Sequence, residues 1–84
     1  MPFAGRAASG YEHGYDGEVF YLGLALDPMY VEGFVEGCLE RIGEDDLEEE
    51  QIFWDLWEDE TQREMVIERL KANCEIRTGR PPGL

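Results

Sequence analysis

The chain has 84 residues, of which 43% are hydrophobic and 12% are aromatic, and it carries a formal net charge of -13 at pH 7. A chain of this length forms one domain at most, and its core is marginal because folding at this size buries only about 60% of the surface of the unfolded chain. The hydrophobic fraction excludes full disorder. The charge disfavours direct binding to nucleic acid or to a membrane and favours basic proteins as partners.

The N-terminal part of the sequence predicts neither a membrane anchor nor a signal peptide. No apolar run approaches the roughly 20 residues of a membrane span, and MPFAGRAASG lacks a long apolar segment, so we expect a cytoplasmic protein. Residues 1–14 mix Gly, Ala, Ser and Pro without periodicity. This composition predicts a flexible N-terminal segment, followed by a single small acidic domain at residues 15–77.

Residues 15–26, YDGEVFYLGLAL, are compatible with two structures. A buried helix is favoured, with Asp16 as its N-cap and Glu18 in its first turn. The alternative is a strand within residues 17–26, because Val19, Phe20 and Tyr21 favour β-structure and Asp16-Gly17 suits a hairpin turn. Such a strand would pair with the segment around Tyr11 or across a dimer.

A helix is predicted to begin at Asp27-Pro28, because Asp is a good N-cap and Pro is preferred at the first helical position. It is expected to reach Ile42 and to stop at Gly43. Its four-residue repeat places one stripe of carboxylates, Glu32, Glu36 and Glu40, opposite a broad apolar side.

Gly33 and Gly37 lie on the border between these two sides of the helix. A glycine in a helix interior costs roughly 1 kcal/mol relative to alanine. We therefore interpret the pair as positions where a neighbouring element approaches the helix closely.

The most acidic stretch is Glu44–Glu60, EDDLEEEQIFWDLWEDE, which holds ten carboxylates, no Lys or Arg, and both tryptophans of the chain. Asp45 or Asp46 is the predicted N-cap of a helix here. Its apolar residues spread over more than half of the helical circumference, which is more than one buried face requires. We expect Trp54, Trp57 or both to stay partly exposed and available to a partner.

The last predicted helix covers residues 62–74. Thr61-Gln62-Arg63-Glu64 matches a capping box, and apolar residues up to Cys74 recur at helical spacing. The pattern is lost after Asn73, and residues 78–84 are expected to form a flexible tail. The predicted fold is therefore mainly α, a small bundle of three or four short helices with flexible ends; the alternative is an α+β fold that contains the strand within residues 17–26.

The sequence contains no catalytic, cofactor-binding or metal-binding signature. His13 is the only histidine and has no nucleophile nearby in sequence, and the acidic run lacks the spacing and the glycine of a calcium loop. We expect no enzymatic activity, no cofactor and no metal. Cys38 and Cys74 have neither CxxC spacing nor a Cys/His pairing, so they are interpreted as small buried hydrophobes, with a disulfide as the alternative.

The acidic stretch carries the functional hypothesis. Carboxylates on one helix face lie about 5–10 Å apart, a spacing similar to that of phosphates along a nucleic-acid strand. In composition the chain resembles the small acidic inhibitors encoded by phages and mobile elements, among them DNA mimics and anti-CRISPR proteins. This resemblance implies an inhibitor or regulator that docks on a basic, nucleic-acid-binding protein.

The alternative function is a small acidic adaptor or homodimeric subunit without mimicry, held by its aromatic helix face. The residues predicted to bind the partner are Glu48, Asp55, Glu58 and Asp59, extended by Glu32, Glu36 and Glu40, with Trp54 and Trp57 as apolar anchors.

Overall fold

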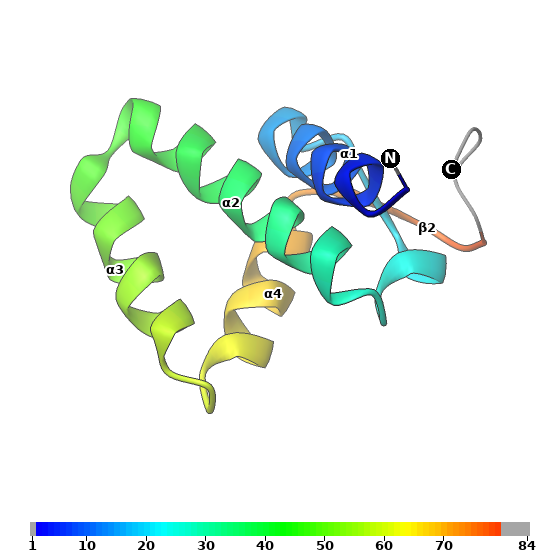
Figure 1. The fold of residues 1–84 in the computed structure, drawn as a ribbon. Coiled ribbons are helices and arrows are strands. Elements are labelled where there is room, and N and C mark those ends of the chain that lie inside the picture. Colours follow the sequence, from blue (N-terminus) through cyan, green and yellow to red (C-terminus); the bar gives the residue numbers. More distant parts are fainter. Residues whose placement is uncertain (1, 80–84) are drawn as a thin grey trace.

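The structure, a computed structural model, describes residues 2–79, with side chains from residue 5 onward. Figure 1 shows a small helical bundle with one short two-stranded sheet. This confirms the predicted mainly helical fold. The elements in chain order are α1 (Pro2–Asp16), β1 (Val19–Tyr21), the short 3-10 helix η1 (Leu22–Leu24), α2 (Pro28–Asp45), α3 (Leu47–Glu58), α4 (Arg63–Lys71) and β2 (Glu75–Arg77).

The interface between α1 and α2 is formed by glycines. A Cβ atom added to Gly10 of α1 would lie 2.2 Å from the carbonyl oxygen of Tyr30. Added to Gly14, it would lie 2.1 Å from the carbonyl oxygen of Phe34. Added to Gly33 or Gly37 of α2, it would lie 2.2 Å from a carbonyl oxygen of α1 in each case. The two backbones are therefore in direct contact, and the predicted close approach at Gly33 and Gly37 is confirmed.

The two helices run in the same direction. Gly10 lies against Tyr30, whereas Gly14, one turn further along, lies against Phe34, one turn further along α2. Small residues spaced by four allow parallel helices to approach in this way, as in the GxxxG pairs of membrane helices.

The prediction that residues 1–14 form a flexible segment is wrong, because residues 2–16 form α1. The Gly and Ala residues of this segment show no apolar periodicity and therefore predict a loop. In the structure these small residues form the face of the helix that contacts α2. The described chain leaves this helix at Gly17, whose φ of 65° is readily available only to glycine. Of the tail predicted at residues 78–84, residues 80–84 lie outside the described part of the chain.

The helix favoured for residues 15–26 is also wrong. Val19–Tyr21 form strand β1, as in the alternative prediction, but the partner is neither the segment around Tyr11 nor a second copy. β1 pairs in parallel with β2, with Phe20 opposite Ile76. Parallel pairing requires a crossover connection, which α2, α3 and α4 provide.

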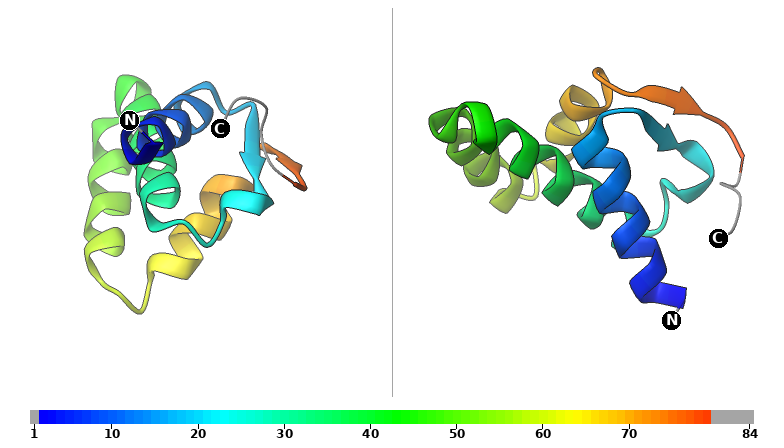
Figure 2. Two further views of the ribbon diagram at one scale, coloured as in Figure 1. Left: turned by 45° about the vertical axis from the view of Figure 1, so that its right-hand side comes forward. Right: turned by 90° about the horizontal axis from the view of Figure 1, so that it is seen from above.

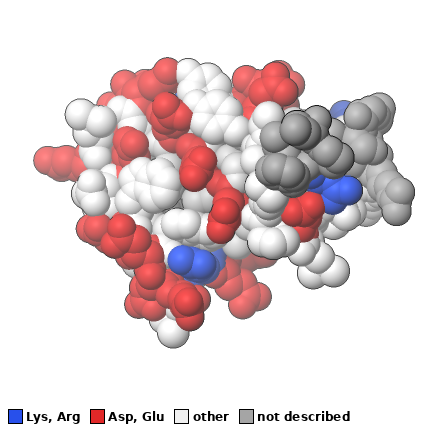
Figure 3. Space-filling view, in the orientation of Figure 1, with Lys and Arg blue, Asp and Glu red and all other residues white. Residues whose placement is uncertain are grey.

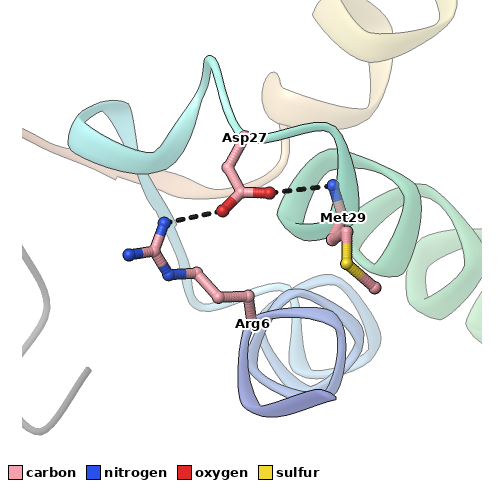
Figure 4. A network of polar contacts seen from close by, with 3 residues as sticks. All are labelled: Arg6, Asp27 and Met29. Atoms are coloured by element: carbon pink, nitrogen blue, oxygen red, sulfur yellow. Dashed lines mark hydrogen bonds and ion pairs between the residues drawn. The ribbon is translucent and has the colours of Figure 1, made fainter. Parts of the chain in front are cut away.

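α2 begins at the predicted position. Asp27 is its N-cap, and one carboxylate oxygen accepts a hydrogen bond from the Met29 amide at 2.9 Å. The other oxygen accepts from the Arg6 guanidinium at 2.6 Å, which joins the N-terminal part of α1 to the start of α2 (Figure 4). Burial alone would raise the pKa of Asp27, but the bonds from Arg6 and from the backbone outweigh it and lower that pKa.

α2 ends later than predicted. It passes through Gly43 and reaches Asp45, because the Asp46 amide still donates to the carbonyl of Ile42, at 2.8 Å. Asp46 is both the C-cap of α2 and the N-cap of α3, so the chain turns between the two helices within one residue.

The core lies between α1, α2, α4 and β1. Its fully buried side chains come mostly from α2, joined by Phe20 of β1 and Val66 of α4. The ring of Phe20 meets that of Phe34 edge-on, at 4.7 Å between centroids. α3 contributes no buried residue. The views in Figures 1 and 2 agree that α3 lies at the opposite side of the molecule from the β1–β2 sheet.

Candidate functional site

The candidate site is the acidic surface of α2 and α3. α3 starts at Asp46, whose carboxylate accepts hydrogen bonds from the amides of Glu48 and Glu49 at 3.0 and 3.1 Å. This confirms one of the two predicted N-caps. The first turn contains Glu48, Glu49 and Glu50, whose negative charges interact favourably with the positive, N-terminal end of the helix dipole. The local sequence thus stabilises a helix that is covered with carboxylates.

The most exposed apolar side chains of α3 are not its tryptophans. Leu47 is 74% exposed and Ile52 is 59% exposed, whereas Trp54 and Trp57 are half-buried against the core. Arg63 covers part of Trp57, with its guanidinium carbon 5.0 Å from the ring centroid and its Nε donating to the Trp57 carbonyl at 2.8 Å. Leu47 and Ile52 are therefore candidate anchors that were not predicted from the sequence.

All seven predicted carboxylates are exposed. Within the described residues, four of them have no hydrogen-bond or ion-pair partner for their side chains: Glu32, Glu36, Glu48 and Glu58. They lie on two helices that pack against each other, so the structure brings the two predicted acidic sets onto neighbouring elements.

The other three carboxylates have structural partners. Gln51 donates to Asp55 at 3.0 Å. Asp59 accepts from the Thr61 hydroxyl at 2.7 Å and from the Thr61 amide at 3.0 Å, and these bonds lower the pKa of Asp59. Glu40 accepts from the hydroxyl of Tyr11, which raises the pKa of Tyr11 to about 12.

The bonds at Asp59 correct the capping box predicted at Thr61. The Thr61 hydroxyl is bonded to Asp59, which lies before it, and the N-cap of α4 is Gln62, without a side-chain cap bond. α4 also ends at Lys71, short of the predicted residue 74, and Cys74 lies in the turn before β2.

Two tyrosines of α1 border the acidic stripe of α2. Tyr11 donates to Glu40 and Tyr15 donates to Glu44, and the two rings stack at 6.0 Å between centroids. The hydrogen bond to Glu44 raises the pKa of Tyr15. Neither tyrosine is among the residues predicted from the sequence, because Tyr11 falls in the segment predicted to be flexible. Their four-residue spacing is the signal that places them on one helix face.

Figure 3 shows how the charges are distributed on one face of the molecule. Acidic side chains are spread over the region of α2 and α3, with uncharged side chains between them and few basic atoms. In the described part of the chain, no three or more His, Cys, Asp or Glu residues are grouped so that they could hold a metal ion. Among residues 2–79, no helix combines the length and the apolar character needed to cross a bilayer.

Comparison of the chain with protein-family models, with curated proteins and with solved structures gives no match.

Proposed function

We propose that the protein is a small acidic inhibitor or regulator that docks on a basic, nucleic-acid-binding protein through the carboxylate-rich surface of α2 and α3. The observation that carries this proposal is the outer surface of α3. Its stretch, Glu44–Glu60, combines ten carboxylates with no Lys or Arg, and it exposes Leu47 and Ile52. One side of the helix packs half-buried against the core, but a helix that serves only the core would not expose large apolar side chains elsewhere.

Two kinds of contact are available on this surface. The carboxylates without side-chain partners, Glu32, Glu36, Glu48 and Glu58, provide a field that accelerates association with a basic partner and orients it. Leu47 and Ile52 provide exposed apolar contact area on α3, the helix that also carries Glu48 and Glu58. Apolar anchors surrounded by polar groups are typical of the centre of a protein interface.

Mimicry of nucleic acid is the specific form of this proposal. Carboxylates repeating at helical spacing can occupy the positions where the groove of a basic protein binds phosphates. A homodimer through α3 is the second candidate, favoured by the exposure of Leu47 and Ile52. The net charge of -13 opposes it, because pairing two copies brings like charges together.

The test compares two variants with the same net charge. In the first, Glu32, Glu36, Glu48 and Glu58 are replaced by Gln. In the matched control, four carboxylates outside this surface, all exposed, are neutralised: Glu12→Gln, Asp16→Asn, Glu18→Gln and Glu64→Gln. Partners captured from a lysate of the source cell on the immobilised protein are released with salt and identified, and their affinity for each variant is then measured.

We expect the captured partner to be a basic nucleic-acid-binding protein whose affinity falls by about 10- to 100-fold in the first variant and much less in the control. Affinity should drop steeply with salt, and nucleic acid should compete. Equal losses in both variants, or affinity independent of salt, would contradict the proposal. Sedimentation of the protein alone at twice its mass would favour the homodimer.

A further inference from the structure

The two cysteines of the chain lie next to each other. Cys38, on α2, belongs to the buried core and is 6% exposed, and Cys74, in the turn between α4 and β2, is half-buried against the same core. Both are free thiols, and they lie close enough for each to influence the pKa of the other. The Cys74 thiol itself donates to the Leu70 carbonyl, with sulfur and oxygen 3.8 Å apart. The interpretation of Cys38 as a small buried hydrophobe describes its packing but not this juxtaposition.

Both thiols face a pocket of about 290 Å³ that opens between the C-terminal end of α1, the middle of α2 and the turn after α4. Polar groups from several elements line it as well, including Asp16, Arg41 and Asn73. A small thiol-reactive molecule that enters this pocket therefore meets Cys74 as the more exposed thiol, whereas Cys38 is almost fully buried.

We propose that Cys38 and Cys74 form an oxidisable dithiol site. Its co-substrate is a small disulfide of the glutathione type, and its product is an intramolecular disulfide between α2 and the turn before β2. The site is independent of the proposed partner-binding function, because it uses neither the carboxylates nor the exposed apolar residues of α3.

The reaction balances in two exchange steps. The thiol of Cys74 loses its proton to solvent, and its sulfur attacks the disulfide, forming a mixed disulfide and releasing one thiolate, which takes up a proton. The thiol of Cys38 then loses its proton, its sulfur attacks that of Cys74, and the second small thiol leaves. The two protein thiols lose two electrons and two protons in total, and the small disulfide is reduced to two thiols.

The order of the two steps follows from the surroundings of each sulfur. Cys74 is the more exposed thiol and reacts first, whereas Cys38 is enclosed and resolves the mixed disulfide. Burial, with a further contribution from Cys74, raises the pKa of Cys38 to about 12, and burial also raises the pKa of Cys74. Because the thiolate is the reactive form, the exchange should be slow at neutral pH and faster as the pH rises.

The disulfide would close a loop that contains all of α3 and α4. In the reduced protein this part of the chain is held by packing, through the buried Val66 and Leu70 of α4 and through half-buried side chains of α3. Closing a loop of this length restricts the unfolded chain and stabilises the folded one. The bond would thus fasten the turn after α4 to α2 and close the loop that carries the acidic surface of α3.

The test incubates the full chain with mixtures of reduced and oxidised glutathione. Free thiols are then blocked, and the intact mass is measured without reductant. We expect a monomer that has lost the mass of two hydrogen atoms, and a melting temperature about 10 °C or more above that of the reduced protein. Formation should be faster at higher pH.

Cys74→Ser and Cys38→Ala serve as matched controls. Cys74→Ser removes the exposed thiol without opening the core and should show no disulfide and no rise in melting temperature. Cys38→Ala, read by mass alone, should stop at the adduct of one glutathione on Cys74. Two free thiols at every glutathione ratio, two glutathione adducts, or a disulfide-linked dimer would overturn the site, and an intramolecular disulfide without a rise in melting temperature would overturn its fastening role.

Discussion

At the scale of single residues, a buried hydrogen-bond chain joins α1, β1 and α2. The Tyr30 side chain is fully buried, and its hydroxyl oxygen accepts from the Tyr21 amide at 3.1 Å and lies 2.8 Å from Nδ1 of His13. A neutral His13 with its proton on Nε2 can accept the hydroxyl proton of Tyr30 at Nδ1. The only histidine of the chain thus has a structural role.

This chain predicts a dependence of stability on pH. Burial lowers the pKa of His13, although Glu12 and Asp16 of the same helix act in the opposite direction. The unfolded chain therefore binds the proton more readily than the folded one, so stability is full above the ordinary histidine pKa of about 6.5 and decreases as the pH falls toward the folded pKa. The aromatic rings of Tyr21 and Tyr30 face the imidazole from the other elements.

The measurement is the urea midpoint between about pH 8 and about pH 5, compared with that of His13→Gln. Gln retains an oxygen that can accept from Tyr30 but does not titrate, so the stability of the native protein should fall relative to the variant on acidification. Parallel profiles for the two proteins would contradict the assignment.

At the scale of elements, the contact of α1 with α2 depends on the absence of four side chains. Gly10, Gly14, Gly33 and Gly37 each bring their backbone against a carbonyl of the other helix, and that carbonyl cannot move without separating the helices. A glycine costs helix stability by itself. The cost is offset here because close approach increases dispersion contacts along the whole interface.

Alanine substitutions test this interface. Gly10→Ala, Gly14→Ala, Gly33→Ala or Gly37→Ala should each lower the free energy of unfolding by about 2 kcal/mol or more, since the added carbon overlaps backbone atoms. Gly5→Ala is the matched control in α1, because no atom lies within 4 Å of an added Cβ there. It should raise stability by up to about 1 kcal/mol. Equal effects at Gly5 and Gly10 in chemical denaturation would show that helix propensity, and not packing, dominates.

Elements whose signals are local could be predicted from the sequence alone. Asp27 and Asp46 cap the helices that were predicted to start there, because a cap depends on residues one to three positions away. The sequence alone was insufficient for α1, whose helical face consists of small residues, and for β1, whose partner Glu75–Arg77 lies at the other end of the described chain. Strand pairing between such distant segments leaves no periodic signal.

The candidate site was predictable to a similar extent. The helical repeat of Glu32, Glu36 and Glu40 was enough to place these residues on the surface. It could not show that Leu47 and Ile52, and not the tryptophans, would be the most exposed apolar residues of α3. That outcome depends on which arc of α3 is covered by α2 and α4, and therefore on tertiary packing.

At the scale of the whole molecule, the net charge of -13 acts against compactness. Within the described residues only three ion pairs form, and each joins one basic and one acidic side chain. Most carboxylates therefore repel one another across a molecule whose radius of gyration is 12.1 Å, which is shorter than the screening length of roughly 20 to 30 Å at low salt.

Salt should therefore stabilise this protein while it weakens the proposed complex. Raising NaCl from about 20 mM to about 0.5 M should increase the melting temperature by several degrees, because screening reduces the repulsion among carboxylates. Calorimetry on the variant with Gln at positions 32, 36, 48 and 58 should show a higher melting temperature in low salt and a smaller response. A melting temperature that does not change with salt would mean that the repulsion is already relieved in the fold.

The glycine interface also determines how this sequence can diverge. A surface that works through charge tolerates exchange of Glu for Asp and movement of carboxylates along a helix, so its residues can drift without loss. Gly10-x-x-x-Gly14 and Gly33-x-x-x-Gly37 tolerate no side chain, because a carbonyl occupies the space that a Cβ would need. Distant relatives would therefore share these two glycine pairs and the helix cap at Asp27 between them, and would be recognised by that spacing when no acidic position is retained.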